Sequence, residues 1–138
     1  MNTALKQTQN NVVYLYTSKV SCGFPSPADD YIENPLDLNE HLISKPAATF
    51  FVRAKGDSMI NCGIYDGDLI IIDRSLDPQS GNVVLASING EFTLKRFINN
   101  SEGAYLQPEN SKYRPIDINE NSDFQIFGVA IHSVHKLL

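Results

Sequence analysis

Short hydrophobic runs separated by turn residues fill the chain after Pro46, a pattern typical of closely connected β-strands. The runs cover residues 50–54, 69–72, 83–88, 91–97, 104–107 and 124–134. Residues 69–72 are all apolar and mostly β-branched, which predicts a strand that is covered on both faces. We therefore expect an all-β domain, built mainly of short strands and hairpins.

Turn residues set the connections between these runs. Asn89-Gly90 separates the third run from the fourth, and this pair is favoured in type I′ hairpins. Residues 66–68 and 77–81 predict two further reversals of the chain. Gly128 lies inside the last run, where it predicts a β-bulge.

The N-terminal segment has a different character from the rest of the chain. Residues 1–23 are rich in Asn, Thr, Gln and Ser, which predicts an extended arm. The arm leads into Cys22-Gly23-Phe24-Pro25-Ser26-Pro27, where two prolines disfavour a helix, so the backbone near Gly23 should form an exposed turn. Further on, the spacing of apolar residues predicts a short helix over residues 38–43 with Asp37 as its cap.

The charge balance argues against direct contact with nucleic acid. The 138 residues include 11 Lys and Arg against 16 Asp and Glu, a formal net charge of -5, and a negative chain repels phosphates. The length suits one domain with a short arm. No apolar run approaches the roughly 20 residues needed to cross a bilayer, and the polar N-terminus lacks the features of a secretory signal. We expect a cytoplasmic protein.

The residues offer little support for the common hydrolase and metal sites. No Gly-x-Ser-x-Gly elbow is present, so a histidine-based triad on an α/β-hydrolase sheet is not expected. His132 and His135 are three positions apart on a predicted strand and should point to opposite faces, which disfavours a shared metal. Cys22 and Cys62 are too few for a disulfide scaffold and should remain thiols. We expect no metal and no cofactor.

Gly56-Asp57-Ser58-Met59 follows the first predicted strand directly, in a segment that must turn. A serine at a strand end beside a glycine can present its hydroxyl outward while nearby backbone N–H groups converge on one point. A serine that acts as the nucleophile in acyl transfer needs such an accessible hydroxyl beside converging N–H donors. The same residues are also ordinary turn formers, so the motif by itself leaves both interpretations open.

Lys95 is the residue that could activate such a serine. Its neighbours on the same face of the strand, Thr93 and Phe97, carry no opposite charge. If that face is covered, desolvation penalises the ammonium and favours a neutral amine able to accept a proton. The alternative is that Phe92 and Leu94 face the core and Lys95 lies in solvent, and simple alternation favours this alternative.

Four blocks of residues together resemble a known family. In chain order they are Cys22-Gly23-Phe24-Pro25-Ser26-Pro27, Gly56-Asp57-Ser58-Met59, Asp66-Gly67-Asp68-Leu69 and Gly90-Glu91-Phe92-Thr93-Leu94-Lys95-Arg96. From about Cys22 to the C-terminus the chain resembles the LexA-like Ser-Lys self-cleaving proteins of peptidase family S24. Within them it is most similar to the UmuD-type accessory subunits of error-prone DNA polymerase V. A LexA-type repressor would need a winged-helix domain before the cleavage turn, and the segment ending at Cys22 is too short to build one.

The resemblance implies a role for each matching residue. Ser58 would be the nucleophile and Lys95 its general base, while the backbone amides of Asp57 and Ser58 would stabilise the oxyanion. The scissile bond would be Cys22–Gly23. Residues 1–23 would then form an N-terminal arm removed by self-cleavage, and residues 24–138 a β-rich Ser-Lys peptidase-like domain.

The resemblance also implies partners. The chain would form a homodimer, a RecA filament on single-stranded DNA would activate the cleavage, and the shortened product would act with a UmuC-type subunit in translesion synthesis during the SOS response. No membrane and no direct nucleic-acid contact are expected. Two other functions stay open: a UmuD-like transcriptional co-regulator and a non-enzymatic β-barrel adaptor.

Overall fold

The computed structural model describes residues 12–16, 18–25, 27, 33–118 and 123–138, and the chain divides into two compact units, 1–44 and 45–138. In the first unit, β1 (Tyr14–Tyr16) pairs antiparallel with β2 (Glu33–Pro35). The helix α1 (Leu38–Leu42) follows, and the Asp37 carboxylate caps it by accepting from the Asn39 N–H at 3.0 Å. The predicted helix and its cap are confirmed.

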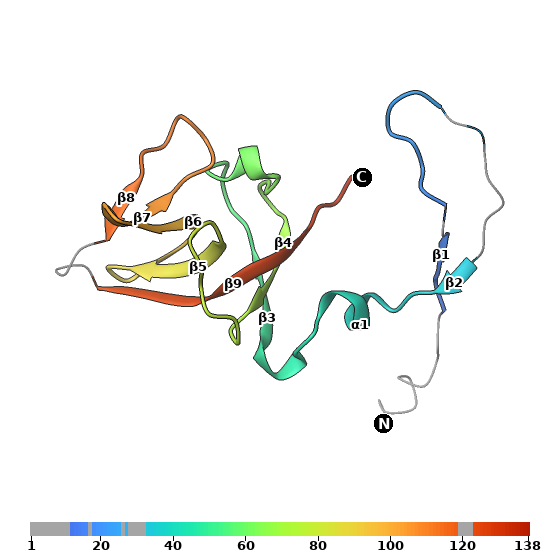
Figure 1. Ribbon diagram of the computed structural model, residues 1–138, viewed down its shortest axis with the longest axis horizontal. Coiled ribbons are helices and arrows are strands. Elements are labelled where there is room, and N and C mark those ends of the chain that lie inside the picture. Colours follow the sequence, from blue (N-terminus) through green and yellow to red (C-terminus); the bar gives the residue numbers. More distant parts are fainter. Residues whose placement is uncertain (1–11, 17, 26, 28–32, 119–122) are drawn as a thin grey trace. The chain divides into compact units, whose positions relative to one another are not determined.

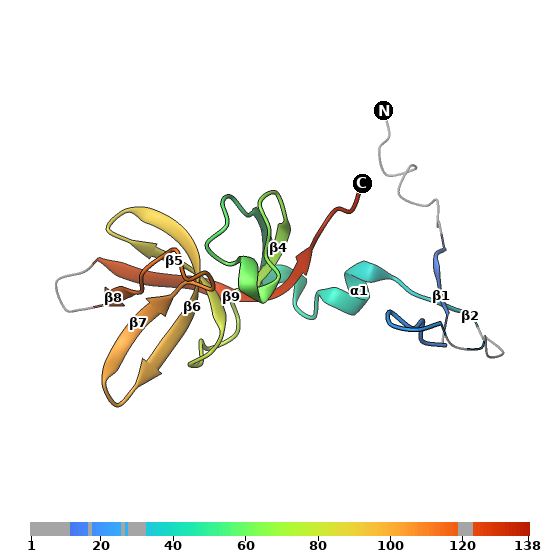
Figure 2. The ribbon, with the colours of Figure 1, turned by 90° about the horizontal axis from the view of Figure 1, so that it is seen from above.

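The second unit is built around one antiparallel sheet of seven strands. Their order across the sheet is β3-β4-β9-β5-β6-β7-β8. The strands are β3 (Thr49–Arg53), β4 (Leu69–Asp73), β5 (Val83–Ile88), β6 (Glu91–Asn100), β7 (Gly103–Gln107), β8 (Ile116–Ile118) and β9 (Phe124–Val134). Figure 1 shows β9 as the long red strand between β5 and β4, and Figure 2 shows the β6–β7 hairpin from above. The expected all-β class is confirmed.

Each hydrophobic run after Pro46 forms a strand, with ends that differ from the predicted ones by up to three residues. Two single-turn 3-10 segments, η2 (Pro46–Ala48) and η3 (Ile60–Cys62), flank β3 and the turn after it. The sequence did not predict β8 or the pairing of β1 with β2. These strands are three residues long, too short for an alternation of apolar and polar positions to be recognised.

The core confirms that residues 69–72 are covered on both faces, because Ile70, Ile71 and Ile72 are all buried. Successive side chains of a strand alternate between faces, and β5 shows this directly. Leu85 packs in a cluster with Ile70 and Ile72, while its neighbour Val84 packs in a second cluster on the other face. The sheet therefore carries apolar packing on each side. No helix in the described residues has the length and apolar character needed to cross a membrane.

The hairpin between β5 and β6 forms as predicted. Asn89 and Gly90 both have positive φ, 51° and 84°, as a type I′ turn requires. The turn pairs Ile88 with Glu91 and sets the register that places Val84 opposite Lys95. A slip of one residue would turn every side chain of β6 to the other face. The local turn therefore decides which face carries Lys95.

The predicted bulge at Gly128 is also present. Leu85 pairs with Gly128 and Ala86 with Ile126, so Phe127 is the additional residue in β9. A Cβ atom at position 128 would lie 2.5 Å from Ile72 Cγ2. Glycine is therefore required because β4 approaches the backbone closely, and this contact could not be seen in the sequence.

Candidate active site

Ser58 lies in the turn that follows β3. The chain leaves the strand, reverses at Gly56, whose φ is +90°, and continues through Ser58 into η3. The Gly56 N–H donates to the Asp66 carboxylate at 2.7 Å, which ties this turn to the one before β4. The predicted turn is thus present, and it places Ser58 between β3 and β4 along the chain.

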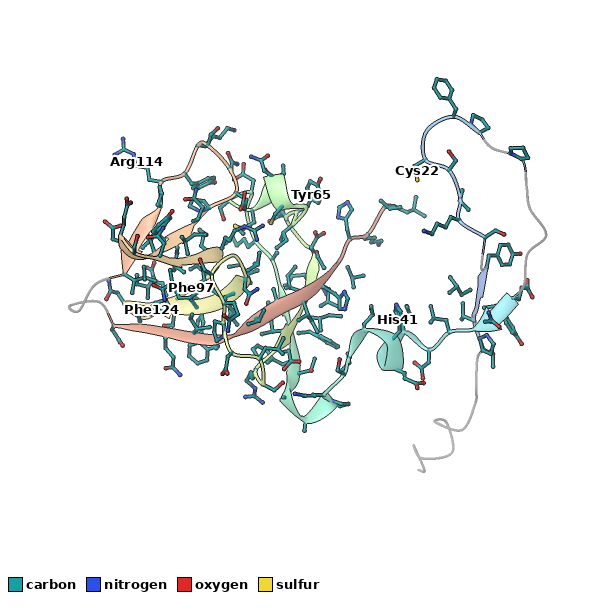
Figure 3. The ribbon with its side chains drawn as sticks, viewed as in Figure 1. Cys22, His41, Tyr65, Phe97, Arg114 and Phe124 are labelled. Carbon is teal, nitrogen blue, oxygen red and sulfur yellow. The ribbon has the colours of Figure 1, made fainter. Side chains whose placement is uncertain are left out.

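A buried carboxylate supports the turn before β4. Asp68 is 2% exposed and accepts hydrogen bonds from the Tyr65 N–H at 2.8 Å and the Ser133 hydroxyl at 3.1 Å. His135 Nδ1 lies 2.6 Å from the same carboxylate, and its ring lies against Tyr65, which Figure 3 labels in the segment between η3 and β4. Burial raises the pKa of Asp68, but these hydrogen bonds outweigh it and lower the pKa. His135 therefore has a structural partner in the Asp68 carboxylate.

Lys95 is buried next to Ser58. The whole residue is 9% exposed, and its Nζ lies 2.9 Å from Ser58 Oγ. The same nitrogen lies 2.7 Å from Thr93 Oγ1 and 3.1 Å from the Leu94 carbonyl oxygen. Within the described part of the chain no carboxylate lies within 4.0 Å of it. Burial without an opposite charge lowers the pKa of Lys95.

The structure decides between the two interpretations of β6. Lys95 faces the interior and Phe92 is 65% exposed, so the alternative is wrong for these two residues. Its third residue, Leu94, does pack against the core. Thr93 shares the face of Lys95 as predicted, but its hydroxyl contact with Nζ was not foreseen. The prediction treated Thr93 only as a neighbour without charge.

A cavity of about 450 Å³ opens beside these two side chains. Ser58 and Lys95 contribute polar atoms to its wall, and apolar side chains such as Val52, Leu85 and Leu94 line much of the rest. This volume and lining suit a short stretch of polypeptide rather than a highly charged ligand.

The backbone around Ser58 offers hydrogen-bond donors to a bound group. Among the described residues, neither the Asp57 N–H nor the Ser58 N–H has an acceptor. Two adjacent N–H groups in a turn of this kind can stabilise a developing negative charge on oxygen. Both residues were singled out for this role by the family resemblance.

Cys22 and Gly23 belong to the first unit and lie in a bend where both are exposed. The Ser21 hydroxyl donates to the Phe24 carbonyl at 2.5 Å and spans the pair. Figure 3 labels Cys22 on the loop that follows β1. The exposed turn predicted at Gly23 is present, so this peptide bond is accessible to a protease.

Sequence reasoning missed a loop that supports the turn with Ser58. We call residues 108–113, between β7 and β8, the bracing loop. Glu109 donates its N–H to the Ser58 carbonyl at 2.8 Å and accepts at its own carbonyl from the Asn61 N–H at 2.9 Å. Its carboxylate pairs with Arg96 Nε. The cluster Pro108-Glu109-Asn110-Ser111 signals a turn, but nothing in the sequence indicates what the turn contacts.

Comparisons with known proteins extend over both units of the chain. Residues 14–131 match the family described as Peptidase S24-like. The chain is 46% identical over 124 residues to Protein ImpA of Salmonella typhimurium, covering 88% of this chain and 83% of that protein. It is 47% identical over 122 residues to Protein SamA of Salmonella typhimurium strain LT2, covering 88% and 84% of the two chains.

A more distant similarity links the chain to a protein named LexA repressor, from Caldicellulosiruptor saccharolyticus. The two are 38% identical over 128 residues, which make up 92% of this chain and 61% of the repressor. The residues matched by the family, 14–131, include Cys22, Ser58 and Lys95.

Proposed function

Because the chain belongs to the Peptidase S24-like family, as its resemblance to the LexA-like self-cleaving proteins predicted, we propose that it is a UmuD-type subunit that cuts its own Cys22–Gly23 bond. In this proposal residues 1–23 form the arm and residues 24–138 the Ser-Lys peptidase-like domain; the cut releases residues 1–22 and leaves Gly23 at the start of the shortened chain. The shortened chain then acts in error-prone DNA synthesis during the SOS response.

One observation supports the chemistry above all others: Lys95 Nζ lies 2.9 Å from Ser58 Oγ, and both groups border the cavity. A nucleophile and its base must lie within hydrogen-bond reach. A serine hydroxyl is a weak nucleophile on its own and needs this contact. The pair requires no histidine and no metal.

The surroundings of Lys95 suit a neutral amine. Such an amine has two N–H donors and one lone pair, whereas an ammonium has three donors and no lone pair. The two donors match Thr93 Oγ1 at 2.7 Å and the Leu94 carbonyl oxygen at 3.1 Å. In the neutral amine the lone pair remains for the Ser58 hydroxyl, 2.9 Å away, which then donates to Nζ; the ammonium instead donates to Ser58 Oγ along the same contact.

The reaction begins when Lys95 Nζ takes the hydroxyl proton of Ser58 and Oγ attacks the carbonyl carbon of Cys22. The carbonyl oxygen becomes an oxyanion, which the N–H groups of Asp57 and Ser58 stabilise. When the tetrahedral intermediate collapses, the C–N bond breaks and the Lys95 ammonium returns its proton to the new amino group of Gly23. An ester between Ser58 and Cys22 remains.

Water completes the cycle. Lys95 accepts a proton from a water molecule while the water oxygen attacks the ester carbonyl. The Ser58 oxygen then leaves and recovers its proton from Lys95. The products are a peptide that ends in the Cys22 carboxylate and a chain that begins at Gly23.

The substrate is part of the polypeptide itself, so it binds within one chain or within a homodimer. The effective concentration of the arm at the cavity is therefore high, and tight binding of the arm is not needed. The rate then depends on how often the arm occupies the cavity. We propose that a RecA filament on single-stranded DNA raises this occupancy in the cytoplasm. A UmuC-type polymerase subunit would take up the shortened chain.

Replacing the two proposed catalytic residues tests this function. Ser58→Ala and Lys95→Ala in the full chain should each abolish the slow appearance, without any activator, of a fragment that begins at Gly23, measured by mass spectrometry. Each removes a group that the chemistry requires, so a loss of at least about 10³-fold is expected.

Matched variants provide the controls. Ser111→Ala and Lys112→Ala remove an exposed serine and an exposed lysine and should cleave at the wild-type rate. If Ser58→Ala still cleaves at Cys22–Gly23, another nucleophile does the chemistry and the proposal fails.

A further inference from the structure

The bracing loop reaches the residue next to the proposed nucleophile with two side chains. The Asn110 amide donates to the Asp57 carbonyl at 2.9 Å, and the Tyr113 hydroxyl donates to the Asp57 carboxylate. Figure 3 labels Arg114, the residue that follows this loop. Neither Asn110 nor Tyr113 lines the cavity, so these contacts do not serve substrate binding directly. They hold the backbone of Asp57 from the side of the loop.

Because a peptide group is planar, the contact at the Asp57 carbonyl also fixes the orientation of the Ser58 N–H. The Asp57 carbonyl and the Ser58 N–H belong to one planar trans peptide group and therefore point in opposite directions. The Asp57 carbonyl also accepts from the Ile60 N–H at the longer distance of 3.3 Å. While it is held in this direction by Asn110 and Ile60, the Ser58 N–H must face the opposite side. Hydrogen bonds onto the carbonyl also polarise this N–H and strengthen it as a donor, by roughly 10–30% per bond.

The bracing loop is itself held in place, so it can impose this orientation. Asn110 Oδ1 accepts from the Lys112 N–H at 3.0 Å, which leaves the Asn110 Nδ2 group as the atom that faces Asp57. The ion pair between Arg96 and Glu109 ties the loop to β6, the strand that carries the lysine. The bracing loop thus contacts both the turn that contains Ser58 and the strand that contains Lys95.

We infer that Asn110 and Tyr113 are positioning residues that act through Asp57 and keep the Ser58 N–H aimed at the developing oxyanion. The inference rests on the proposed function, because it concerns the rate of that self-cleavage. Neither residue touches the reacting atoms. Their loss should lower the rate of the bond-making step and leave the proton affinity of Lys95 unchanged.

The test compares the full chain with Asn110→Ser and Tyr113→Phe over the neutral to alkaline range. Serine can still accept from the Lys112 N–H, although more weakly, but it lacks the amide donor. Phenylalanine lacks only the hydroxyl. Ser111→Ala, in the same loop, is the control. The rate at which the Gly23 fragment appears is fitted to a plateau and a pH midpoint, and thermal unfolding is recorded for each variant.

We expect the plateau rate to fall about 10- to 100-fold for Asn110→Ser and about 3- to 10-fold for Tyr113→Phe, because a misaligned oxyanion donor loses part of its effect. The pH midpoint should stay at the wild-type value in both. The control should cleave within about twofold of wild type. Hydrogen bonding to Asp57 raises the pKa of Tyr113, so its hydroxyl keeps its proton over most of the range.

Two results would overturn the inference. A plateau at the wild-type rate in both variants would show that the contacts do not act on the reaction. A plateau, a midpoint and an unfolding temperature that all change together would show that the loop only supports the fold. If Asn110→Ser does not fold, Tyr113→Phe decides, because it removes one oxygen from a residue that is 44% exposed.

The same experiment separates this inference from the proposed function. If the wild-type chain cleaves and Ser58→Ala does not, the proposed function stands whatever Asn110→Ser does. If Ser58→Ala also cleaves, the proposed function fails, and the positioning role fails with it.

Discussion

At the scale of single residues, burying the Lys95 ammonium lowers the stability of the folded state. An ammonium loses hydration when it is buried, and the described residues place no carboxylate within 4.0 Å of Nζ to compensate. The hydroxyls of Ser58 and Thr93 and the Leu94 carbonyl replace only part of the lost water. The same burial that lowers the pKa of Lys95 therefore destabilises the fold at neutral pH.

Replacing Lys95 by methionine should stabilise the protein while abolishing self-cleavage. We expect Lys95→Met to raise the free energy of unfolding at pH 7 by more than about 0.5 kcal/mol, the usual limit for an exposed site, because methionine carries no charge that burial penalises. Denaturant unfolding monitored by circular dichroism measures this. Lys112→Met, at an exposed lysine, should change it by less than about 0.5 kcal/mol.

The dependence of this difference on pH has a definite sign. Below the folded-state pKa of Lys95, both the folded and the unfolded chain hold the proton, so wild type carries the full cost. As the pH rises from that pKa toward 10.5, the ordinary lysine value, the unfolded lysine loses its proton too and the cost disappears. The two unfolding curves should therefore converge at high pH. A difference that grows with pH would contradict a lowered pKa.

At the scale of elements, β9 connects the two halves of the sheet. It pairs with β4 on one side and β5 on the other, and its register shifts on both sides: between Ile71 and Ile72 opposite β4, and between Leu85 and Ala86 opposite β5. Bulges bend a strand and increase its twist. With these two bulges, β9 can pair on one side with β4, which pairs with β3 before the Ser58 turn, and on the other side with β5 of the hairpin that carries Lys95.

Substituting Gly128 tests how closely β4 packs on this bend. In Gly128→Ala the added Cβ would lie 2.5 Å from Ile72 Cγ2 and 3.1 Å from the Asp73 carbonyl oxygen. Overpacking of this kind should lower the free energy of unfolding by about 1–3 kcal/mol, measured by denaturant unfolding. Gln125→Ala, at an exposed position of the same strand, should change it by less than about 0.5 kcal/mol. An unchanged stability of Gly128→Ala would mean that β4 can move aside.

At the scale of the whole molecule, charge favours contacts with proteins over contacts with DNA. The formal net charge of -5 gives the chain the same sign as a phosphate backbone. A protein that works during DNA synthesis with such a charge is expected to reach the nucleic acid through its partners. The proposed activator and polymerase subunit would supply that contact.

Binding measurements can test this division of roles. At about 0.15 M salt, labelled single-stranded and duplex DNA should show no change in fluorescence anisotropy with the full chain up to about 100 µM, because no counterions are released. The same chain should co-sediment with a RecA filament formed on single-stranded DNA. Binding of naked DNA in the low micromolar range would instead favour the co-regulator or the β-barrel adaptor.

The sequence by itself determined the features that depend on neighbouring residues. Alternation and β-branching located most strands of the larger sheet, the Asn89-Gly90 pair set the β5–β6 turn, and Asp37 marked the start of α1. These determinants act over a few positions, so they can be read along the chain. Ser58 and Lys95 were singled out with the help of the family resemblance, since alternation alone favoured a solvated lysine.

Only the tertiary structure decided what depends on residues far apart in the chain. Burial in the folded chain lowers the pKa of Lys95, and its Nζ meets Ser58 Oγ across 37 positions. The bracing loop meets Asp57 across 53 positions, and Gly128 is required by the approach of β4. Such contacts are set by how the strands pack and pair, and packing involves all the strands at once rather than any local pattern.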